Sequence, residues 1–204
     1  MSSSIKPKIA HLILAAGKSD RMGRCKQLLP WRSTTLIGHA IEQSLHLDTV
    51  KTYVILGAYY NEIYNQIKVF PVEIIKNKDW QLGMGTSIRN GIIALQKDEE
   101  SYDGVLISLV DQPLIDTNHY AGLINKYINS DKTIVATSNK DGVGVPVLLS
   151  KGYFNELRQL DSDYGARHIL KKYTTEIYEV SLENKNIDID TFEEYQLLIK
   201  DHFV

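Results

Sequence analysis

The stretch LILAAGKSDRMGRCKQLLPW, residues 12–31, decides the fold. Its start belongs to an almost unbroken apolar run, Ile9–Ala15, which is typical of a central strand covered by helices on both faces. The run ends in Ala-Ala-Gly and enters a loop interrupted by Gly17 and Gly23. This loop carries four basic side chains, Lys18, Arg21, Arg24 and Lys26. Because glycines let backbone N–H groups approach a ligand and basic side chains supply charge, the loop is suited to an anion.

Apolar runs alternate with helical patterns from this strand almost to the end of the chain. The alternation predicts a three-layer α/β/α fold in a single domain, with a mostly parallel, Rossmann-like sheet. Strands are expected over residues 9–15, 50–56, 72–75, 104–110, 133–137, 145–149 and 176–180, with 187–189 extended. Helices are expected over 34–47, 60–67, 86–95, 117–128, 153–160, 166–173 and 191–200, with Thr117 capping the fourth.

Length and composition are those of one globular domain. The chain has 204 residues, of which 43% are hydrophobic and 24% charged, so we expect a short tail over residues 1–7 and one domain over 8–204. A formal net charge of −2 argues against a general nucleic-acid or membrane-surface binder. Cys25 is the single cysteine, which fits a reducing compartment, and no apolar run reaches the roughly 20 residues of a membrane span. The chain is therefore expected to be cytoplasmic.

The glycine spacing in the basic loop excludes two familiar phosphate motifs. Five residues separate Gly17 from Gly23, which fits neither the dinucleotide pattern G-x-G-x-x-G nor the P-loop pattern. A guanidinium at Arg21 and an ammonium at Lys26 could still bind different parts of a triphosphate. The alternative, a solvent-exposed basic loop, leaves the apolar residues of MG and LLP within it unexplained.

Two acidic stretches are candidates for a metal site. Asp111 follows the apolar run GVLISLV, which delivers one carboxylate to the ligand edge of the sheet, although the same residue could simply begin a turn before Pro113. Mg²⁺ usually takes one or two protein carboxylates together with phosphate oxygens of the substrate. In NIDIDTFEEY, Asp188 and Asp190 occupy alternate positions of an extended segment. We expect Asp190 to complete the site if this segment crosses near Asp111, and Asp188 to be a surface acid.

A third loop, NKDWQLGMGTSIRNG, places Gly83 and Gly85 before an expected helix whose first turn holds Thr86 and Ser87. A helix N-terminus with glycines and hydroxyl groups can receive a phosphate or the edge of a base. Simple capping of the helix by Thr86 and Ser87 is the alternative.

Six motifs occur in an order that resembles a known family. They are LILAAGKSDRMGRCKQLLPW, NKDWQLGMGTSIRNGI, LVDQPLI, GVGVPVLLSKGYF, DSDYGARHIL and DIDTFEEY. Together they resemble the molybdenum cofactor cytidylyltransferases, within the glycosyltransferase-A-like nucleotidyltransferases. The resemblance covers nearly the whole chain and implies the fold of the nucleotide-diphospho-sugar transferases. The motifs LAAG and DQP resemble those of the cytidylyltransferase branch, because related guanylyltransferases typically have LAGG in place of LAAG.

The resemblance implies transfer of CMP from CTP to the terminal phosphate of molybdopterin, with release of pyrophosphate. It implies Mg²⁺ as cofactor, with Mn²⁺ as an alternative, and a recipient molybdoenzyme as a further partner. The implied nucleotide-binding residues are Leu14, Ala15, Ala16, Gly17, Lys18, Arg21, Lys26, Gly83, Met84, Ser87 and Asp111, of which Arg21, Lys26 and Asp111 would be catalytic. The implied metal ligands are Asp111 and Asp190, and the implied acceptor-binding residues are Gln112, Pro146, Asp163 and Arg167.

Three residues depart from the family pattern. Cys25 and Phe192 stand where proline is common, and Val145 stands where the family often has histidine. Since Val145 removes a polar side chain near the expected acceptor site, the acceptor stays open. Alternatives are transfer from GTP or another nucleotide, transfer to another phosphorylated acceptor such as a sugar phosphate, and a non-catalytic carrier of the molybdenum cofactor.

Overall fold

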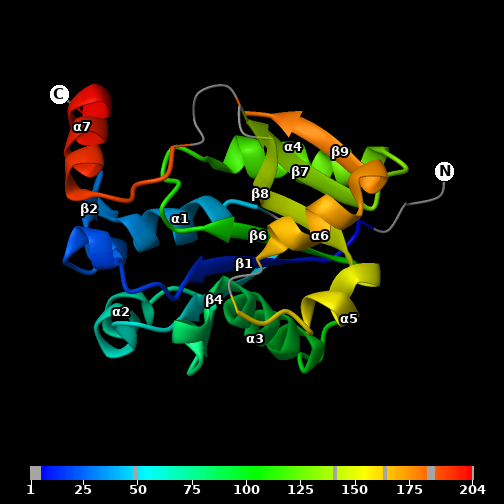
Figure 1. Cartoon of the computed structure of the whole chain (residues 1–204), viewed down its shortest axis with the longest axis horizontal. Helices are drawn as coiled ribbons and strands as arrows, with labels where there is room; N and C mark the ends of the chain where they lie inside the picture. Colours follow the sequence, from blue (N-terminus) through cyan, green and yellow to red (C-terminus); the bar gives the residue numbers. More distant parts are fainter. Residues whose placement is uncertain (1–5, 48–49, 140–141, 163–164, 183–186, 204) are drawn as a thin grey trace.

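A seven-stranded sheet forms the centre of the molecule (Figure 1). The computed structural model describes residues 6–47, 50–139, 142–162, 165–182 and 187–203. The strands of the sheet are β1 (Ile9–Ala15), β4 (Val50–Leu56), β5 (Glu73–Lys76), β6 (Gly104–Leu109), β7 (Ile134–Asn139), β8 (Gly142–Ser150) and β9 (Ile177–Ser181). A separate two-stranded ribbon consists of β2 (Pro30–Trp31) and β3 (Thr34–Thr35).

The strand order is β5-β4-β1-β6-β8-β7-β9. The antiparallel strand is β8, which pairs in that sense with both β6 and β7, while the other pairings described in this sheet are parallel. The predicted mostly parallel sheet is therefore confirmed. The chain builds outward from β1 to β4 and β5, then returns to place β6 on the other side of β1. In open sheets, ligands bind beyond the carboxyl ends of the strands where the order reverses in this way.

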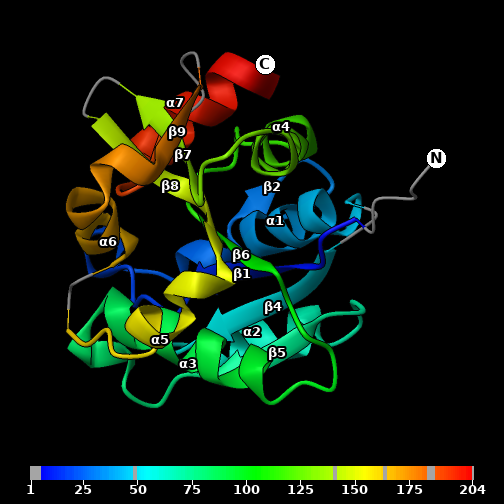
Figure 2. The same cartoon turned by 90° about the vertical axis from the view of Figure 1, so that its right-hand side faces the viewer.

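Helices cover both faces of the sheet, as Figure 2 shows. They are α1 (Leu36–Leu45), α2 (Tyr60–Ile67), α3 (Met84–Gln96), α4 (Thr117–Asn129), α5 (Phe154–Leu157), α6 (Ala166–Lys172) and α7 (Phe192–Phe203). Side chains of α3, α5 and α6 form one core cluster, those of α1, α2 and α7 a second, and those of α4 a third. No helix in the described parts of the chain is long and apolar enough to cross a membrane.

The central strand β1 supplies side chains to both faces. Leu12 and Leu14 belong to the cluster with α3, α5 and α6, whereas Ile13 and Ala15 belong to the cluster with α1, α2 and α7. Every residue of β1 is buried, as expected of a strand covered on both sides. This packing fixes the direction in which the loop after Ala15 leaves the sheet.

The predicted cap of α4 is wrong. Asp116 is the N-cap residue, and its side chain accepts a hydrogen bond from the backbone N–H of His119 at 3.0 Å. Thr117 is the first helical residue instead, and its hydroxyl donates to the backbone carbonyl of Gln43 in α1 at 2.9 Å. A carboxylate caps at least as well as a hydroxyl, and the bond to α1 occupies the threonine.

One other predicted element differs from the structure. The helix expected over 153–160 is a 3₁₀ turn, Lys151–Tyr153, followed by the single turn of α5. Leu160 completes the apolar spacing that suggested a longer helix, yet it is buried from irregular backbone. Over 153–160 the apolar spacing thus predicts burial correctly and the length of the helix incorrectly. Residues 187–190 have no regular secondary structure. In this last segment Ile189 is fully buried, whereas Ile187 is 42% exposed.

A buried histidine in β1, His11, takes part in a hydrogen-bond network that links β1 to α1, β4 and β6. Its Nδ1 lies 2.6 Å from the hydroxyl of Ser44 in α1, and its Nε2 lies 2.8 Å from that of Ser108 in β6. Ser44 continues the chain of hydrogen bonds to Thr52 in β4 at 2.7 Å. His11 itself is fully buried, and this burial lowers its pKa to about 3.

His11 is expected to make folding pH-dependent. The pKa of His11 is lowered on folding, so its contribution to stability is complete above the unfolded value near 6.5 and is lost as the pH falls toward the folded value of about 3. At pH 5 this loss is about 2 kcal/mol relative to pH 8. Urea unfolding at both pH values should show that His11→Gln removes this part of the difference. An unchanged difference in the variant would exclude His11 as its source.

Candidate active site

A cleft of about 500 Å³ lies at the carboxyl ends of β1 and β6. Its volume lies in the range of small-ligand sites. The structure brings together in its lining all the residues expected to bind the nucleotide: Leu14, Ala15, Ala16, Gly17, Lys18, Arg21, Lys26, Gly83, Met84, Ser87 and Asp111. Asp190, the expected second metal ligand, lines the same cleft. One ligand could therefore contact all of them, although their roles remain predictions.

The loop after β1 is anchored in the core at two points. Met22 is only 6% exposed and belongs to the cluster with α1, α2 and α7, and Gly23 follows with a φ of 66°, a left-handed conformation that glycine adopts without strain. Leu29 is buried in the same cluster. These are the apolar residues of MG and LLP that a fully solvent-exposed loop leaves unexplained. The loop is thus a packed part of the fold.

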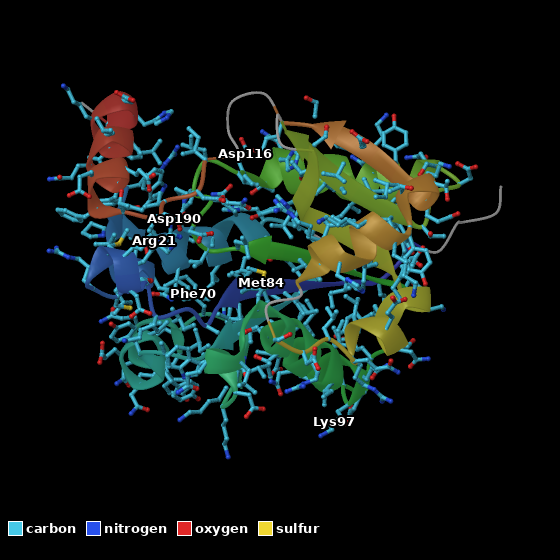
Figure 3. All side chains as sticks on the ribbon, in the orientation of Figure 1. Arg21, Phe70, Met84, Lys97, Asp116 and Asp190 are labelled. Atoms are coloured by element: carbon cyan, nitrogen blue, oxygen red, sulfur yellow. The ribbon has the colours of Figure 1, made fainter. Side chains whose placement is uncertain are left out.

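Lys26 is at the centre of a charged cluster in the cleft. Its ammonium, on a side chain that is 10% exposed, lies 2.8 Å from Oδ2 of Asp111 and 3.7 Å from Oδ1 of Asp190. It also donates to the carbonyl of Ile189 at 2.7 Å. Arg21 lies 3.0 Å from Oδ2 of Asp190, and Figure 3 shows this pair beside α7. Both basic residues expected to contact phosphates are paired with acids, so a triphosphate would compete with these acids for them.

The segment before α7 crosses the end of β6. The N–H of Ile189 donates to the carbonyl of Asp111 at 2.9 Å, and the side chain of Ile189 is fully buried. This crossing is what brings Asp190 to the cleft. Asp188, expected to be a surface acid, is exposed but also accepts a hydrogen bond from Nε2 of Gln112 at 2.9 Å. Desolvation raises the pKa of Asp188, and the charges of Asp111 and Asp190 add to that rise.

Asp111 and Asp190 are suited to hold a divalent cation. Oδ1 of Asp111 is buried and has no hydrogen-bond partner among the described residues, whereas Oδ2 accepts from Lys26. A buried carboxylate oxygen without a donor is costly, and a cation would satisfy it. Because a single ammonium reaches both carboxylates, a cation between them could do the same. Hard oxygen ligands of this kind suit Mg²⁺ and Mn²⁺.

Asn77 shapes the wall of the cleft that α3 contributes. It is fully buried, and its amide donates to the hydroxyls of Thr86 and Ser87 at 2.8 and 3.0 Å. Helix α3 begins at Met84, earlier than predicted, and its N-cap Gly83 makes no side-chain capping bond. The alternative prediction, that Thr86 and Ser87 cap this helix, is therefore wrong. Asn77 holds both hydroxyls, and Ser87 also lines the cleft.

Of the expected acceptor residues, the three that the structure describes do not line this cleft. Gln112 is buried and does not line the cleft, and Pro146 is buried within β8. Arg167 lies on the exposed side of α6, whose buried residues are Ala166, Ile169 and Leu170. It lines a separate groove. Asp163 lies outside the described residues. Val145 is half-buried and packs against the core cluster of α3, α5 and α6. As a valine it offers no polar group to an acceptor.

Comparison with known proteins identifies the family. Residues 11–177 match the MobA-like NTP transferase domain. The chain belongs to this family. Among solved structures, Rv0371c from Mycobacterium tuberculosis H37Rv is 25% identical with a TM-score of 0.83, covering 97% of this chain and 100% of that one. A complex of Rv0371C with manganese is 24% identical with a TM-score of 0.78, covering 95% of this chain and 98% of that one.

Relatives of this MobA-like domain carry different functional names. Nicotine blue oxidoreductase of Paenarthrobacter nicotinovorans is 29% identical, covering 97% of this chain and all of the relative. Molybdenum cofactor cytidylyltransferase of Escherichia coli (strain K12) is 27% identical, covering 90% and 92%. Purine catabolism protein PucB of Bacillus subtilis (strain 168) is 26% identical, covering 94% and 96%. The domain match establishes a nucleotidyltransferase family, and the different names of these relatives leave the nucleotide and the acceptor to be determined.

Sequence reasoning missed several residues of the cleft in this MobA-like domain. They are Ser19, Asp20, Gln27, Trp80, Gln81, Leu109 and Val110. Trp80 lies so close to the end of β4 that a Cβ on Gly57 would come within 2.5 Å of the Trp80 Cβ. Gly57 directly follows a buried strand, and such a glycine is the signal that could have pointed to a close neighbour there.

Glu194 is expected to hold Asp190 in position. Its Oε2 accepts hydrogen bonds from the backbone N–H groups of Asp190 and Thr191, both at 2.8 Å, and these bonds lower the pKa of Glu194. The Thr191 hydroxyl accepts from the N–H of Glu194 in return, which makes a capping box at the start of α7. We expect Glu194→Ala to weaken Mn²⁺ binding by roughly 10-fold or more, as for other groups that orient a metal ligand.

Titration of Mn²⁺ by electron paramagnetic resonance measures this effect without any turnover. Glu193→Ala is the matched control, since Glu193 is an exposed acid in the same first turn. Equal Mn²⁺ affinity in the two variants would contradict the role of Glu194.

Proposed function

We propose that the chain transfers CMP from CTP to the terminal phosphate of molybdopterin and releases pyrophosphate. The observation that carries the proposal is the charged cluster in the cleft, in which Lys26 lies between Asp111 and Asp190 beside the glycine loop. The cluster offers both a cation-binding pair of acids and basic groups for a triphosphate. The cytidylyltransferase of Escherichia coli supports this choice of nucleotide and acceptor, since it aligns over most of both chains.

The proposed reaction needs little proton transfer from the protein. A phosphate monoester is already an anionic nucleophile, so its oxygen can attack the α-phosphorus of CTP while the bond from that phosphorus to the pyrophosphate oxygen breaks. The electron pair of that bond leaves with the pyrophosphate. Arg21 and Lys26 would take the charge that develops on the leaving group, and N–H groups of the loop would hold the phosphates in line. Catalysis by this chain would rest on positioning and electrostatics.

The acids of the cleft would serve this reaction by binding a divalent cation. Asp111 and Asp190 would hold Mg²⁺, or Mn²⁺ in its place, which when bound supplies positive charge that offsets the repulsion between two phosphate groups. Lys26 would then have to leave the carboxylates, which frees its ammonium for the triphosphate.

A second candidate is an oxidoreductase, which the name of the 29% identical relative favours. The glycine spacing of the loop after β1 does not match the dinucleotide pattern, so a dinucleotide cofactor would depend on the basic side chains of the loop. The remaining alternatives are transfer from another nucleoside triphosphate, a different phosphorylated acceptor, and a carrier that binds the cofactor without transferring to it.

Mass spectrometry of the products tests these possibilities together. Purified protein with Mg²⁺ and molybdenum-loaded molybdopterin would be incubated separately with CTP, GTP, ATP and UTP, alongside a known cytidylyltransferase. We expect a cytosine dinucleotide with CTP alone. A dinucleotide formed with another nucleotide would replace CTP as the proposed donor. If no dinucleotide forms while the known cytidylyltransferase is active, molybdopterin is rejected as the acceptor. In a parallel reaction, oxidation of a reduced nicotinamide cofactor by nicotine blue would favour the oxidoreductase.

A further inference from the structure

Three consecutive backbone carbonyls in the loop after β1 are bonded inside the protein. Nε2 of Gln27 donates to the carbonyl of Ala15 at 3.0 Å and to that of Gly17 at 2.8 Å. The carbonyl between them, on Ala16, accepts from the backbone N–H of Ala58 at 3.0 Å. Both hydrogens of one side-chain amide thus hold a loop that lines the cleft.

This arrangement fixes the direction of the loop's N–H groups. In a planar trans peptide the carbonyl and the N–H of the next residue point in opposite directions. Bonding of the Ala15 and Gly17 carbonyls therefore turns the N–H groups of Ala16 and Lys18 away from Gln27. Since these residues line the cleft, donors rather than acceptors are left for a ligand there.

Gln27 lines the cleft, but its amide nitrogen is bonded to the two loop carbonyls and so holds the loop. Its side chain is buried, with only 1% of the residue exposed. The thiol of Cys25 donates to its Oε1 at 3.3 Å, which orients the amide so that its nitrogen faces the two carbonyls. Burial raises the pKa of the Cys25 thiol, so the proton it donates is kept. Cys25, where the family pattern commonly has proline, thereby takes part in holding the loop.

We propose that Gln27 is a positioning residue of the nucleotide site, which presents the N–H groups of residues 16–18 to the phosphates or base of the bound nucleotide. The proposal rests on the proposed function in one respect, namely that a nucleoside triphosphate binds in this cleft. Gln27→Met keeps the length of the side chain and removes both donated hydrogen bonds. Loss of one well-aimed donor to an anionic ligand corresponds to roughly 10- to 100-fold in affinity.

The test combines nucleotide binding, kinetics and amide hydrogen exchange. For Gln27→Met we expect the Kd and KM of CTP to rise roughly 10- to 100-fold while kcat at saturating CTP falls much less. Amide exchange of the loop should accelerate in the ligand-free protein. Gln43→Met is the matched control, because Gln43 also bonds a neighbouring backbone, at the N–H of Thr117, but lies outside the cleft lining. It should leave CTP affinity and loop exchange unchanged.

Other outcomes separate the two proposals. Equal CTP affinity in Gln27→Met and the unmodified protein would overturn the role of Gln27. If none of CTP, GTP, ATP or UTP binds the unmodified protein, the proposed function fails, and unchanged loop exchange in Gln27→Met would independently overturn the positioning role. Should that variant not fold, Cys25→Ala removes only the thiol donor and should raise the Kd of CTP roughly threefold, with Cys25→Ser restoring it. An unaltered Kd in Cys25→Ala would then overturn the proposal.

Discussion

Replacing Asp111 with asparagine is expected to lower kcat/KM for the proposed CMP transfer by roughly 1000-fold, or about 4 kcal/mol of transition-state stabilisation. The buried Oδ1 of Asp111 has no hydrogen-bond partner among the described residues, and its Oδ2 accepts from Lys26. An amide keeps the size of the side chain but loses the negative charge that a cation requires. Steady-state turnover with CTP and molybdopterin measures the loss, and Mn²⁺ titration should show weaker metal binding in parallel.

Asp116→Asn is the control for this change. Asp116 lies on the same loop after β6, but it caps α4, where asparagine serves equally well. Its turnover should stay near that of the unmodified protein, and both variants should unfold cooperatively. Near-normal turnover in Asp111→Asn would remove the metal site from the mechanism. Lost turnover with unchanged Mn²⁺ affinity would instead assign Asp111 to the placement of Lys26.

Local patterns in the sequence are sufficient for the elements that position the site. The bounds of β1, β4 and α2 agree with prediction to the residue. The apolar runs of β1 and β4 are closed by Ala16-Gly17 and by Gly57. The loop after β1 could be recognised from its glycines and basic residues. Asp111 could be placed because an apolar strand delivers it to the carboxyl edge of a parallel sheet.

The partners of these residues could not be predicted, because they are distant in the chain. Lys26 contacts the carbonyl of Ile189, a separation of 163 residues, and Asp111, a separation of 85. Whether a basic residue faces an acid or a substrate depends on how the last segment crosses the sheet. Likewise, nothing local distinguishes Gln27, whose amide closes the loop on itself, from an exposed glutamine.

The contacts of residues that depart from the family pattern could not be predicted from the sequence either. Phe192 stands where proline is common, and in the structure the guanidinium of Arg24 lies 4.3 Å from the centre of its ring. The contact ties the basic loop to the start of α7 through a cation–π interaction. The departure at Phe192 thus adds a contact between the basic loop and α7, which the residue type alone does not predict.

Lys26→Met is expected to change metal binding and nucleotide binding in opposite directions. In the unmodified protein the ammonium of Lys26 is paired with the carboxylates of Asp111 and Asp190, so a cation must displace it from them. Without that competitor, the affinity for Mn²⁺ alone should rise by roughly tenfold, about 1.4 kcal/mol. The KM for CTP should rise by roughly 10- to 100-fold, because the charged donor proposed for the triphosphate is lost. Mn²⁺ titration and steady-state kinetics measure the two effects separately.

The opposite signs are what make this variant informative. A structural defect in the cleft would weaken the binding of both ligands, whereas release of Asp111 and Asp190 from an ammonium strengthens only that of the cation. Lys151→Met is the control, since Lys151 pairs with Asp103 at the amino end of β6, away from the cleft, and should change neither quantity. Weaker Mn²⁺ binding in Lys26→Met would show that the ammonium and the cation do not share the two carboxylates. Lys26 would then assist the acids in binding metal, and its move to the triphosphate would have to be abandoned.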